Sequence, residues 1–403
     1  MKITGVKVYS HTGPYKPVYK SVSRSVGPLD IYDDYSSDVR AKTGRFVKDI
    51  PKRGETISDM FIVITTDEGF EGIHGPVDNR SQLFIAAESV APHIIGRDPL
   101  DNRMIWDIMS RFDRHSRSGS MLMAISAIDN ALWDLKGKIL GQPVYKLLGG
   151  GRNRIRPYMS ALGFSVNPKE AAEKALMIKD MGIKAQKWFF RYGPNDGAEG
   201  MRKNIELAET LRETLGNDYE IMFDCWMGWN IGYAKSIFPS LEAVKPMWIE
   251  EVLRPHMQDG YERLKAETNI PLSAGEHIYT RMEANHYLKK GIFDVMQSDP
   301  EWCGGITEAM KIGDMCELYG IKFIPHGHAL FPAMHVVASM PPDTCPYAEY
   351  LLAIMDHKTN FFKYNPLDSE GFLNLNETPG LGQDFDMEKI IGTEEVKSLT
   401  FKA

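Results

Sequence analysis

The fold is decided by three short apolar runs that each end in an acidic residue: Glu220-Ile-Met-Phe-Asp224, Met247-Trp-Ile-Glu250 and Pro271-Leu-Ser-Ala-Gly-Glu276. Positions 224, 250 and 276 are separated by 26 residues in both intervals. A strand, a connecting helix and the return to the next strand need about this length. The equal spacing therefore predicts equivalent positions in successive strand–helix units of a parallel sheet.

From residue 155 onward, strand-like and helix-like runs alternate regularly. The expected strands lie near 155–162, 184–190, 220–226, 247–252, 272–276, 294–299, 322–327 and 346–351, with helix candidates such as 169–182, 199–215 and 304–319 between them. Eight strands with seven intervening helices predict an α/β fold, a (β/α)7–8 barrel of the TIM type. An open doubly wound sheet is the alternative architecture.

The remaining sequence predicts an N-terminal α+β capping domain over residues 1–120, ahead of a barrel domain over 121–366. Residues 2–10 and 60–74 have strand patterns, and 81–95 and 98–113 have helical ones. The apolar positions of 121–138 share one helix face, which indicates packing between domains or the eighth barrel helix. The segment 367–403 has weak strand signals and is expected to pack back on the capping domain.

Composition narrows the classes of function. The 403 residues carry a formal net charge of −7, which argues against a nucleic-acid partner. No apolar run approaches the roughly 18 residues of a membrane span, so no membrane partner is expected. The first residues lack the apolar core of a signal peptide, and the four cysteines show no C-x-x-C spacing. We therefore expect a cytoplasmic protein with reduced thiols.

Ionisable residues stand at nearly every predicted strand end. In a barrel these positions face the active site; they are Lys187, Asp224, Glu250, Glu276 followed by His277, Asp299, His326 followed by His328, and Glu349. Three converging carboxylates repel one another unless a cation lies between them, and oxygen ligands select a hard divalent ion. Asp224, Glu250 and Glu276 therefore predict one Mg²⁺ site, with helix caps and surface salt bridges as the alternative reading.

Asp299 and His326 end neighbouring strands, so the carboxylate can fix the imidazole tautomer and raise its basicity. His326 is then a candidate general base, and the alternative is a core histidine bonded to a backbone carbonyl. Strand alternation places Glu251 away from the lumen, where a structural ion pair is expected. His328 has the parity of His326 and is a candidate substrate contact.

In combination, these blocks resemble the enolase superfamily, mandelate racemase subgroup, and within it acid-sugar dehydratases of the L-rhamnonate dehydratase type. The matching blocks are Asp224-Cys-Trp-Met227, Trp248-Ile-Glu-Glu251, Gly275-Glu-His277, Trp302-Cys-Gly-Gly305 and Pro325-His-Gly327. The resemblance implies Asp224, Glu250 and Glu276 as metal ligands and Asp299 with His326 as the catalytic dyad. It also implies Glu349 as a hydrogen-bond partner of the enolate, a mechanism with Mg²⁺ and a His base, and a homo-oligomer.

One departure from the resemblance bears on the chemistry. Racemases of this subgroup carry Lys-x-Lys on the second strand, whereas this chain has Lys187-Trp-Phe189. Phe189 cannot take a proton, so racemisation, which needs a base on both faces of the α-carbon, is disfavoured. Dehydration on one face remains possible, with Lys187 and Glu349 hydrogen-bonding the intermediate. His277 is expected to contact the substrate carboxylate or to act as a second acid, and the alternative is that it only supports the neighbouring metal ligand.

The expected activity is a Mg²⁺-dependent dehydration of a sugar acid to a 2-keto-3-deoxy acid, with an L-rhamnonate- or L-lyxonate-like monoacid as the favoured substrate. Trp226, Trp302, Arg24 and Arg45 are further candidate substrate contacts, and a basic residue among them would favour a diacid. The alternatives are epimerisation or another Mg²⁺-dependent proton transfer, and a non-catalytic metabolite-binding regulator.

Overall fold

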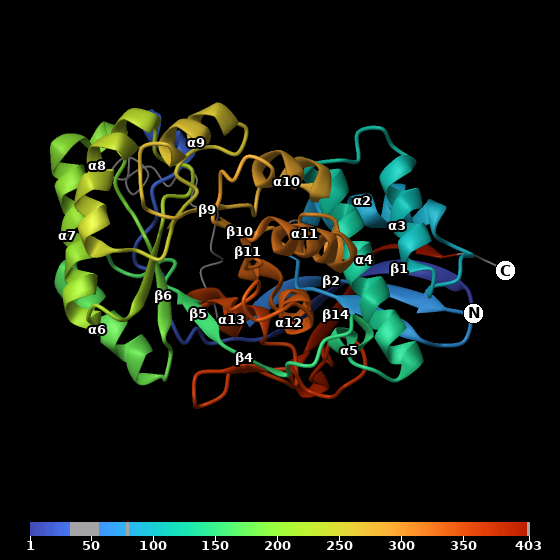
Figure 1. Ribbon diagram of the computed structural model, residues 1–403. Helices are drawn as coiled ribbons and strands as arrows, with labels where there is room; N and C mark the ends of the chain where they lie inside the picture. Colours follow the sequence, from blue (N-terminus) through green and yellow to red (C-terminus); the bar gives the residue numbers. More distant parts are fainter. Residues whose placement is uncertain (33–55, 78–79, 401–403) are drawn as a thin grey trace.

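The computed structural model describes residues 1–32, 56–77 and 80–400. Figure 1 shows a capping domain built on a twisted antiparallel sheet, beside a curled parallel sheet that is ringed by helices. No helix in the described part of the chain combines the length and the apolar character needed to cross a membrane. The four cysteines are buried and unpaired.

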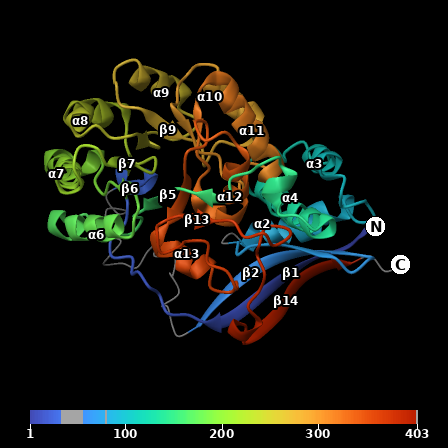
Figure 2. The ribbon, with the colours of Figure 1, turned by 60° about the horizontal axis from the view of Figure 1, so that its bottom comes forward.

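The capping sheet contains four strands in the order β14-β1-β2-β3. Its strands are β1 (Ile3–Pro14), β2 (Thr56–Thr66), β3 (Glu71–His74) and β14 (Gly392–Thr400). β1 and β14 are antiparallel partners, with Val6 opposite Leu399. The last strand of the chain therefore pairs with the first one, as Figure 2 also shows.

The two faces of the capping sheet pack against different parts of the molecule. Val6, Val8 and Ile62 are buried in one core with the cap helices; these are α2 (Arg80–Ile85), α3 (Asn102–Arg111) and α4 (Gly119–Leu140). Phe61 points to the other face, where it contacts Phe361 edge-on at 6.1 Å between ring centroids. This alternation follows from the two-residue period of a strand and leaves β2 covered on both faces.

Helix α4 joins the cap to the barrel. Its apolar residues belong to the cap core, whereas its side chains Ser126, Asp129 and Asn130 accept hydrogen bonds from Gly304, Thr307 and Ile306 at the start of α11 (Gly305–Tyr319). These contacts satisfy backbone N–H groups that a helix start leaves unpaired. Because α4 contributes to both cores, the boundary expected at residues 120 and 121 stays a prediction.

The barrel sheet has eight parallel strands in the order β11-β10-β9-β8-β7-β6-β5-β12. They are β5 (Pro157–Ser160), β6 (Ala185–Phe189), β7 (Glu220–Asp224), β8 (Ile249–Glu250), β9 (Leu272–Ala274), β10 (Val295–Met296), β11 (Lys322–Phe323) and β12 (Ala348–Leu351). The last strand returns to pair with β5, and one backbone hydrogen bond of 2.8 Å from Phe323 to Thr344 bridges the remaining seam. The predicted α/β fold with its capping domain is confirmed as a curled eight-stranded parallel sheet, and its sequential strand order from β5 to β11 differs from that of a doubly wound sheet.

Seven helices connect consecutive barrel strands and lie outside the sheet (Figure 1). They are α6 (Pro168–Asp180), α7 (Gly197–Leu215), α8 (Ile231–Val244), α9 (Gln258–Lys265), α10 (Thr280–Leu288), α11, and α12 (Leu330–Ser339), and α13 (Leu352–Lys358) follows β12. Asn167 caps α6 by accepting from two backbone N–H groups, with Pro168 at the first helical position. Such connections place all carboxyl ends of the strands at one mouth.

Short elements complete the chain. They are α5 (Val144–Leu147), the antiparallel pair β4 (Arg154–Ile155) and β13 (Leu373–Asn374), and the turns η1 (Pro28–Ile31), η3 (Ala86–Val90), η4 (Ala91–His93), η5 (Pro194–Asp196), η6 (Gly327–Ala329) and η7 (Met387–Lys389). None of them lies in the barrel sheet.

The segment after β1 crosses the barrel mouth. Val22 and Ser23 donate backbone hydrogen bonds to Gly163 after β5, and Val26 donates to Phe190 after β6. Gly27 lies so close to the Trp226 ring that an added Cβ would be 3.1 Å from it. Residues 22–27 therefore lie over the ends of β5, β6 and β7, and residues 33–55 lie outside the described residues.

Candidate active site

The predicted strand-end residues converge at the mouth of the barrel. Asp224 and Glu250 are register partners at the ends of β7 and β8, and both are buried. Lys187 of β6 reaches between them, with its Nζ 3.3 Å from Asp224 Oδ2 and 2.5 Å from Glu250 Oε1. The same Nζ lies 3.0 Å from Glu349 Oε1 on β12. One buried ammonium thus links three carboxylates from different strands.

These carboxylates determine the charge of Lys187. Burial alone lowers a lysine pKa, but Glu250 and Glu349 outweigh it and hold the pKa of Lys187 well above its ordinary value. The second oxygen of Glu250 accepts from Trp248 Nε1 at 3.0 Å and from Gln297 Nε2 at 2.8 Å. Lys187 is therefore a cationic hydrogen-bond donor, and Glu250 is fixed in orientation on both of its oxygens.

Glu276 follows Gly275, a position at which a side chain would collide with the neighbouring backbone. Gly275 has φ +143°, and a Cβ at this position would lie 2.6 Å from the backbone N of Gln297 on the neighbouring strand. The close packing directs Glu276 to the mouth, where its Oε2 is 3.2 Å from His326 Nε2 and its Oε1 is 3.6 Å from His277 Nδ1. Burial raises the pKa of Glu276, while His326 and His277 partly offset the rise.

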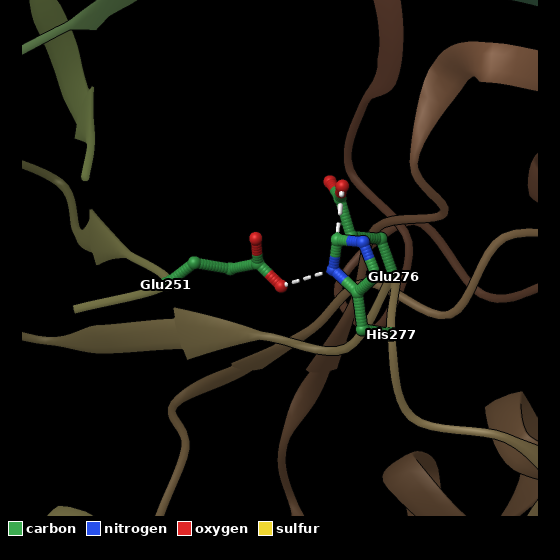
Figure 3. A group of neighbouring side chains, drawn as sticks. All are labelled: Glu251, Glu276 and His277. Carbon is green, nitrogen blue, oxygen red and sulfur yellow. Dashed lines mark hydrogen bonds and ion pairs between the residues drawn. The ribbon is translucent and has the colours of Figure 1, made fainter. Parts of the chain in front are cut away.

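Glu251 does not point where strand alternation predicts. β8 ends at Glu250, and Glu251 has φ +45°, so the period of the strand no longer applies to it. Its Oε1 accepts from the His277 ring at 2.7 Å between Oε1 and Nδ1. The expected ion pair therefore exists, but it lies at the mouth beside Glu276. Figure 3 shows both carboxylates directed at the His277 ring.

The carboxylates at the mouth fit a hard divalent cation. Burial and the neighbouring Glu250 raise the pKa of Asp224, as expected for like charges held together out of water. Glu251 Oε2 is buried without a hydrogen-bond partner among the described residues. Ligand atoms of Glu251, Glu276 and His277 lie within 4.8 Å of one another. Of the three predicted ligands, only Glu276 belongs to this group, whereas Asp224 and Glu250 pair with Lys187. Carboxylate oxygens suit Mg²⁺, and the assignment of Asp224, Glu250 and Glu276 as its ligands stays a prediction.

His326 and Asp299 form the predicted hydrogen-bonded pair. His326 Nδ1 lies 2.7 Å from Asp299 Oδ2, which directs its Nε2 toward Glu276 and toward Glu349, 3.8 Å away. Burial lowers the pKa of His326, but Glu276, Glu349 and Asp299 together raise it to about 9. A cation bound at Glu276 would compensate part of this negative charge and lower the pKa of His326 toward neutrality.

Glu349 is a hydrogen-bond acceptor in this arrangement. Burial raises its pKa, but Lys187 and His326 outweigh burial and lower the pKa to about 2. Glu349 Oε2 accepts from the backbone N–H of Gly327 at 3.0 Å. Lys187 is a hydrogen-bond donor at the same side of the site, and the hydrogen bond expected between Glu349 and the intermediate stays a prediction.

Aromatic rings surround the dyad. Trp302 lies with its ring centroid 5.8, 5.2 and 5.0 Å from those of His277, His326 and His328, respectively. Burial lowers the pKa of His277, but Glu251 and Glu276 outweigh burial and raise it to about 9. Trp226 is 42% exposed at the end of β7. Substrate contacts by these side chains stay predictions.

The two predicted arginine contacts differ in what the structure describes. Arg24 lies in the segment across the mouth, where its Nη1 is 2.7 Å from Asp30 Oδ2 and also donates to the backbone of Ser25. Its role as a substrate contact stays a prediction. Arg45 lies outside the described residues.

Sequence reasoning missed two charged side chains near the dyad, Glu301 and Lys358, and misplaced Glu251. Glu251 was expected elsewhere because its backbone torsion breaks the strand pattern. Glu301 and Lys358 lie beside His328, which has Nδ1 3.0 Å from Glu301 Oε2 and 3.0 Å from Lys358 Nζ. The sequence did hold a signal for Glu301, because a second carboxylate only two residues after Asp299 is expected to lie near the same strand end. Lys358 ends a short helix and had no such signal.

Comparison with known families agrees with this geometry. Residues 170–389 match the model described as Enolase C-terminal domain-like, and residues 54–149 match the Mandelate racemase / muconate lactonizing enzyme, N-terminal domain. The chain therefore belongs to the mandelate racemase / muconate lactonizing enzyme family of the enolase superfamily. The resemblance inferred from the strand-end motifs is confirmed.

Individual relatives show which members of the family this chain is similar to. The chain is 30% identical to an L-rhamnonate dehydratase of Saccharopolyspora erythraea over 335 residues, which cover 81% of this chain and 83% of the relative. It is similar to the crystal structure of L-rhamnonate dehydratase from Gibberella zeae, with 26% identity, a TM-score of 0.80 and coverage of 96% and 94%. A structure of rhamnonate dehydratase from the same organism complexed with Mg gives 25% identity, a TM-score of 0.79 and coverage of 97% and 96%.

Proposed function

We propose that this chain is a Mg²⁺-dependent hydro-lyase that converts a sugar acid into a 2-keto-3-deoxy acid. The observation that carries the proposal is the orientation of His326. Its Nδ1 is held by Asp299 at 2.7 Å and its Nε2 is directed at the carboxylates of the mouth. A base in this position can remove the proton next to a carboxylate that is bound there. The relatives named as L-rhamnonate dehydratases support the same reaction class.

The residues divide the reaction between them. Bound Mg²⁺ supplies positive charge that stabilises the negative charge developing on the substrate carboxylate. His326 Nε2 removes the α-proton, while Asp299 holds the imidazole and stabilises its protonated form. Lys187 donates a hydrogen bond to the intermediate from the side of β6. The protonated His326 then gives its proton to the departing 3-hydroxyl, which leaves as water, and the enol product ketonises.

The opposite side of the site supports dehydration over racemisation. The Phe189 ring lies 5.5 Å from Lys187 Nζ, at the position where the resemblance to racemases would place the second lysine of Lys-x-Lys. Proton transfer through both faces of the α-carbon needs such a base, whereas loss of the α-proton and of the hydroxyl can proceed from one. His277, whose Nδ1 is held by Glu251, remains a candidate contact for the substrate carboxylate.

The favoured substrate is a monoacid similar to L-rhamnonate or L-lyxonate. This choice is supported by the names of the relatives and by the ion pair of Arg24 with Asp30. Because Arg24 is already paired with a carboxylate, a second carboxylate on the substrate would have to compete for it. A diacid is therefore disfavoured at this position.

The proposal is tested by incubating the protein and Mg²⁺ with a panel of aldonates and aldarates in deuterated water. Formation of a keto acid from a monoacid is the expected result. Exchange of the α-proton for deuterium without a keto acid would instead indicate an epimerase. Absence of exchange and of turnover across the panel, together with tight binding of one acid, would indicate a metabolite-binding regulator.

A further inference from the structure

A buried cluster of charged side chains lies beside the catalytic dyad and has no part in the steps above. It consists of Glu301, His328 and Lys358, and we call it the support cluster. Lys358 Nζ lies 3.0 Å from His328 Nδ1 and 3.7 Å from Glu301 Oε2. The side chains of Glu301 and Lys358 are only 1% and 5% exposed. Burying charged groups to this degree costs free energy unless the groups are paired. The presence of this buried charged cluster therefore calls for a structural or functional explanation.

The support cluster is connected to the dyad through two backbone groups. The N–H of His328 donates to Asp299 Oδ2 at 3.2 Å, and the N–H of Glu301 donates to Asp299 Oδ1 at 2.6 Å. Asp299 Oδ2 is also the atom that holds His326 Nδ1. Glu301 and His328 carry these two backbone donors, and the side chains of both residues contact Lys358. Lys358 thus holds both residues in place.

The side chains of Glu301 and Lys358 are too enclosed to contact a substrate. The cavity lined by Glu301, His328 and Lys358 has a volume of about 20 Å³, which is room for one water molecule. A sugar acid does not fit there. Any effect of Glu301 or Lys358 on the reaction must therefore pass through the residues that they hold.

The charges explain why a lysine is needed at this place. Asp299 and Glu301 are two buried carboxylates, two residues apart, whose repulsion would separate them in a medium of low polarity. The ammonium of Lys358, delivered from the end of α13, offsets the charge of Glu301 at 3.7 Å. With this charge in place, the loop of Glu301 and the turn of His328 can both approach Asp299.

We propose that Lys358 is a positioning residue for the dehydration, and that with Glu301 it fixes the His328 backbone and thereby the Asp299 carboxylate that orients His326. The kinetic consequence of this inference rests on the proposed function. A direct contact of His328 with the substrate would affect mainly the KM, whereas positioning of the base affects mainly the kcat.

The first test is kinetic and uses the full-length protein with Mg²⁺ and the acid that it dehydrates. Lys358→Met keeps a side chain of similar length without the charge. A displaced base is expected to lower kcat on the order of 100-fold, with KM changed by less than about threefold. The matched control is Lys265→Met, because Lys265 pairs with Asp294 at the opposite end of the strand that leads to Asp299, 2.7 Å between Nζ and Oδ1. This control should keep the wild-type kcat.

A second variant separates positioning from stability. Lys358→Met alone removes the ammonium that lies 3.7 Å from Glu301 Oε2 and is expected to lower the melting temperature. The double variant Glu301→Gln/Lys358→Met removes both charges and should recover the melting temperature while kcat stays low. Recovery of kcat together with stability, or a wild-type kcat in Lys358→Met, would show a merely structural role and overturn the proposal.

A crystal structure of Lys358→Met keeps the inference testable if the wild-type protein dehydrates no acid and the proposed function fails. Positioning by Lys358 requires that the distance between Asp299 Oδ2 and His326 Nδ1 increases beyond hydrogen-bonding range, from 2.7 Å in the present structure. An unchanged distance in the variant would overturn the inference whatever the substrate is.

Discussion

Replacing His326 with Asn removes the proposed base and keeps most of its surroundings. An asparagine amide can still hydrogen-bond to Asp299, so the local packing should change little. The amide cannot accept a proton from the substrate at any accessible pH. The variant therefore separates proton abstraction from the binding of the acid and of Mg²⁺.

The size of the effect follows from the groups that remain. A positioned general base contributes about 10²- to 10⁴-fold to the rate, or about 3 to 5 kcal/mol in activation free energy. We expect the upper part of this range, because Lys187 cannot replace His326. Although burial lowers the pKa of Lys187, Glu250 and Glu349 hold it well above the ordinary value, so that Lys187 keeps its proton.

The assay measures keto-acid formation and α-deuterium exchange, with Mg²⁺ affinity determined by calorimetry. Both rates should fall in parallel in His326→Asn. Mg²⁺ affinity should be nearly unchanged, since Asp224, Glu250 and Glu276 all remain in the variant. His115→Asn, an exposed position on the cap, is the matched control and should behave as the wild type.

Two outcomes would refute this reasoning. Keto-acid formation within about tenfold of the wild-type rate would show that another group removes the α-proton, since a general base contributes at least about 10²-fold. Loss of Mg²⁺ binding in the variant would show instead that His326 supports the metal site, and the rate change would then say nothing about a base.

Three further predictions concern the metal, the backbone and pH. Glu250→Gln should weaken Mg²⁺ binding in a calorimetric titration more than Glu251→Gln does. The reverse order would assign the ligand role to Glu251, which Figure 3 shows beside Glu276 and His277. Gly327→Ala should lower both kcat and thermal stability, by about 1 to 3 kcal/mol in unfolding free energy, because its Cβ would lie 2.5 Å from the backbone O of Glu349; wild-type stability would contradict this packing. Burial lowers the pKa of His335 to about 4, and its Nδ1 accepts from the N–H of Tyr145. The folded protein therefore binds this proton more weakly than the unfolded chain, and about 3 kcal/mol of stability should be lost as the pH falls from about 6.5 to about 4. His335→Gln should flatten this part of the pH–stability profile in denaturant titrations, and an unchanged slope would show that His335 does not titrate as described.

The barrel and its mouth were predictable because one structural unit repeats along the chain. The spacing of Asp224, Glu250 and Glu276 indicated equivalent strand ends, and the same position on other strands gave Lys187, His326 and their neighbours. Each of these residues lies at the mouth because the carboxyl ends of parallel strands share one edge. A periodic sequence feature was thus sufficient to locate the site.

Glu251 shows where this reasoning stops. Alternation of side chains holds only while the backbone stays extended, and β8 ends one residue earlier. The positive φ of Glu251 comes from the turn that follows the strand, in a residue type that gives no local signal for it. Its partner His277 belongs to the next strand unit, so the contact depends on the assembled mouth.

Lys358 was missed for a different reason. A lysine in the last turn of a helix is favoured by the helix dipole and is usually exposed. Nothing in the sequence of Leu352–Lys358 distinguishes Lys358 from a solvent-exposed lysine at a helix end. It is buried because Glu301 and His328, from two other strand ends, lie against it. Burial of this sort follows from tertiary packing and not from local pattern.

The pairing of β14 with β1 has a consequence for biosynthesis. During translation, β1 leaves the ribosome among the first residues, whereas Gly392–Thr400 emerges only after the whole barrel has been made. Until then the outer edge of β1 has free N–H and C=O groups, which readily recruit strands from other chains. Truncation before Gly392 should therefore cause aggregation of nascent protein, even though every acidic strand end of the barrel would still be present.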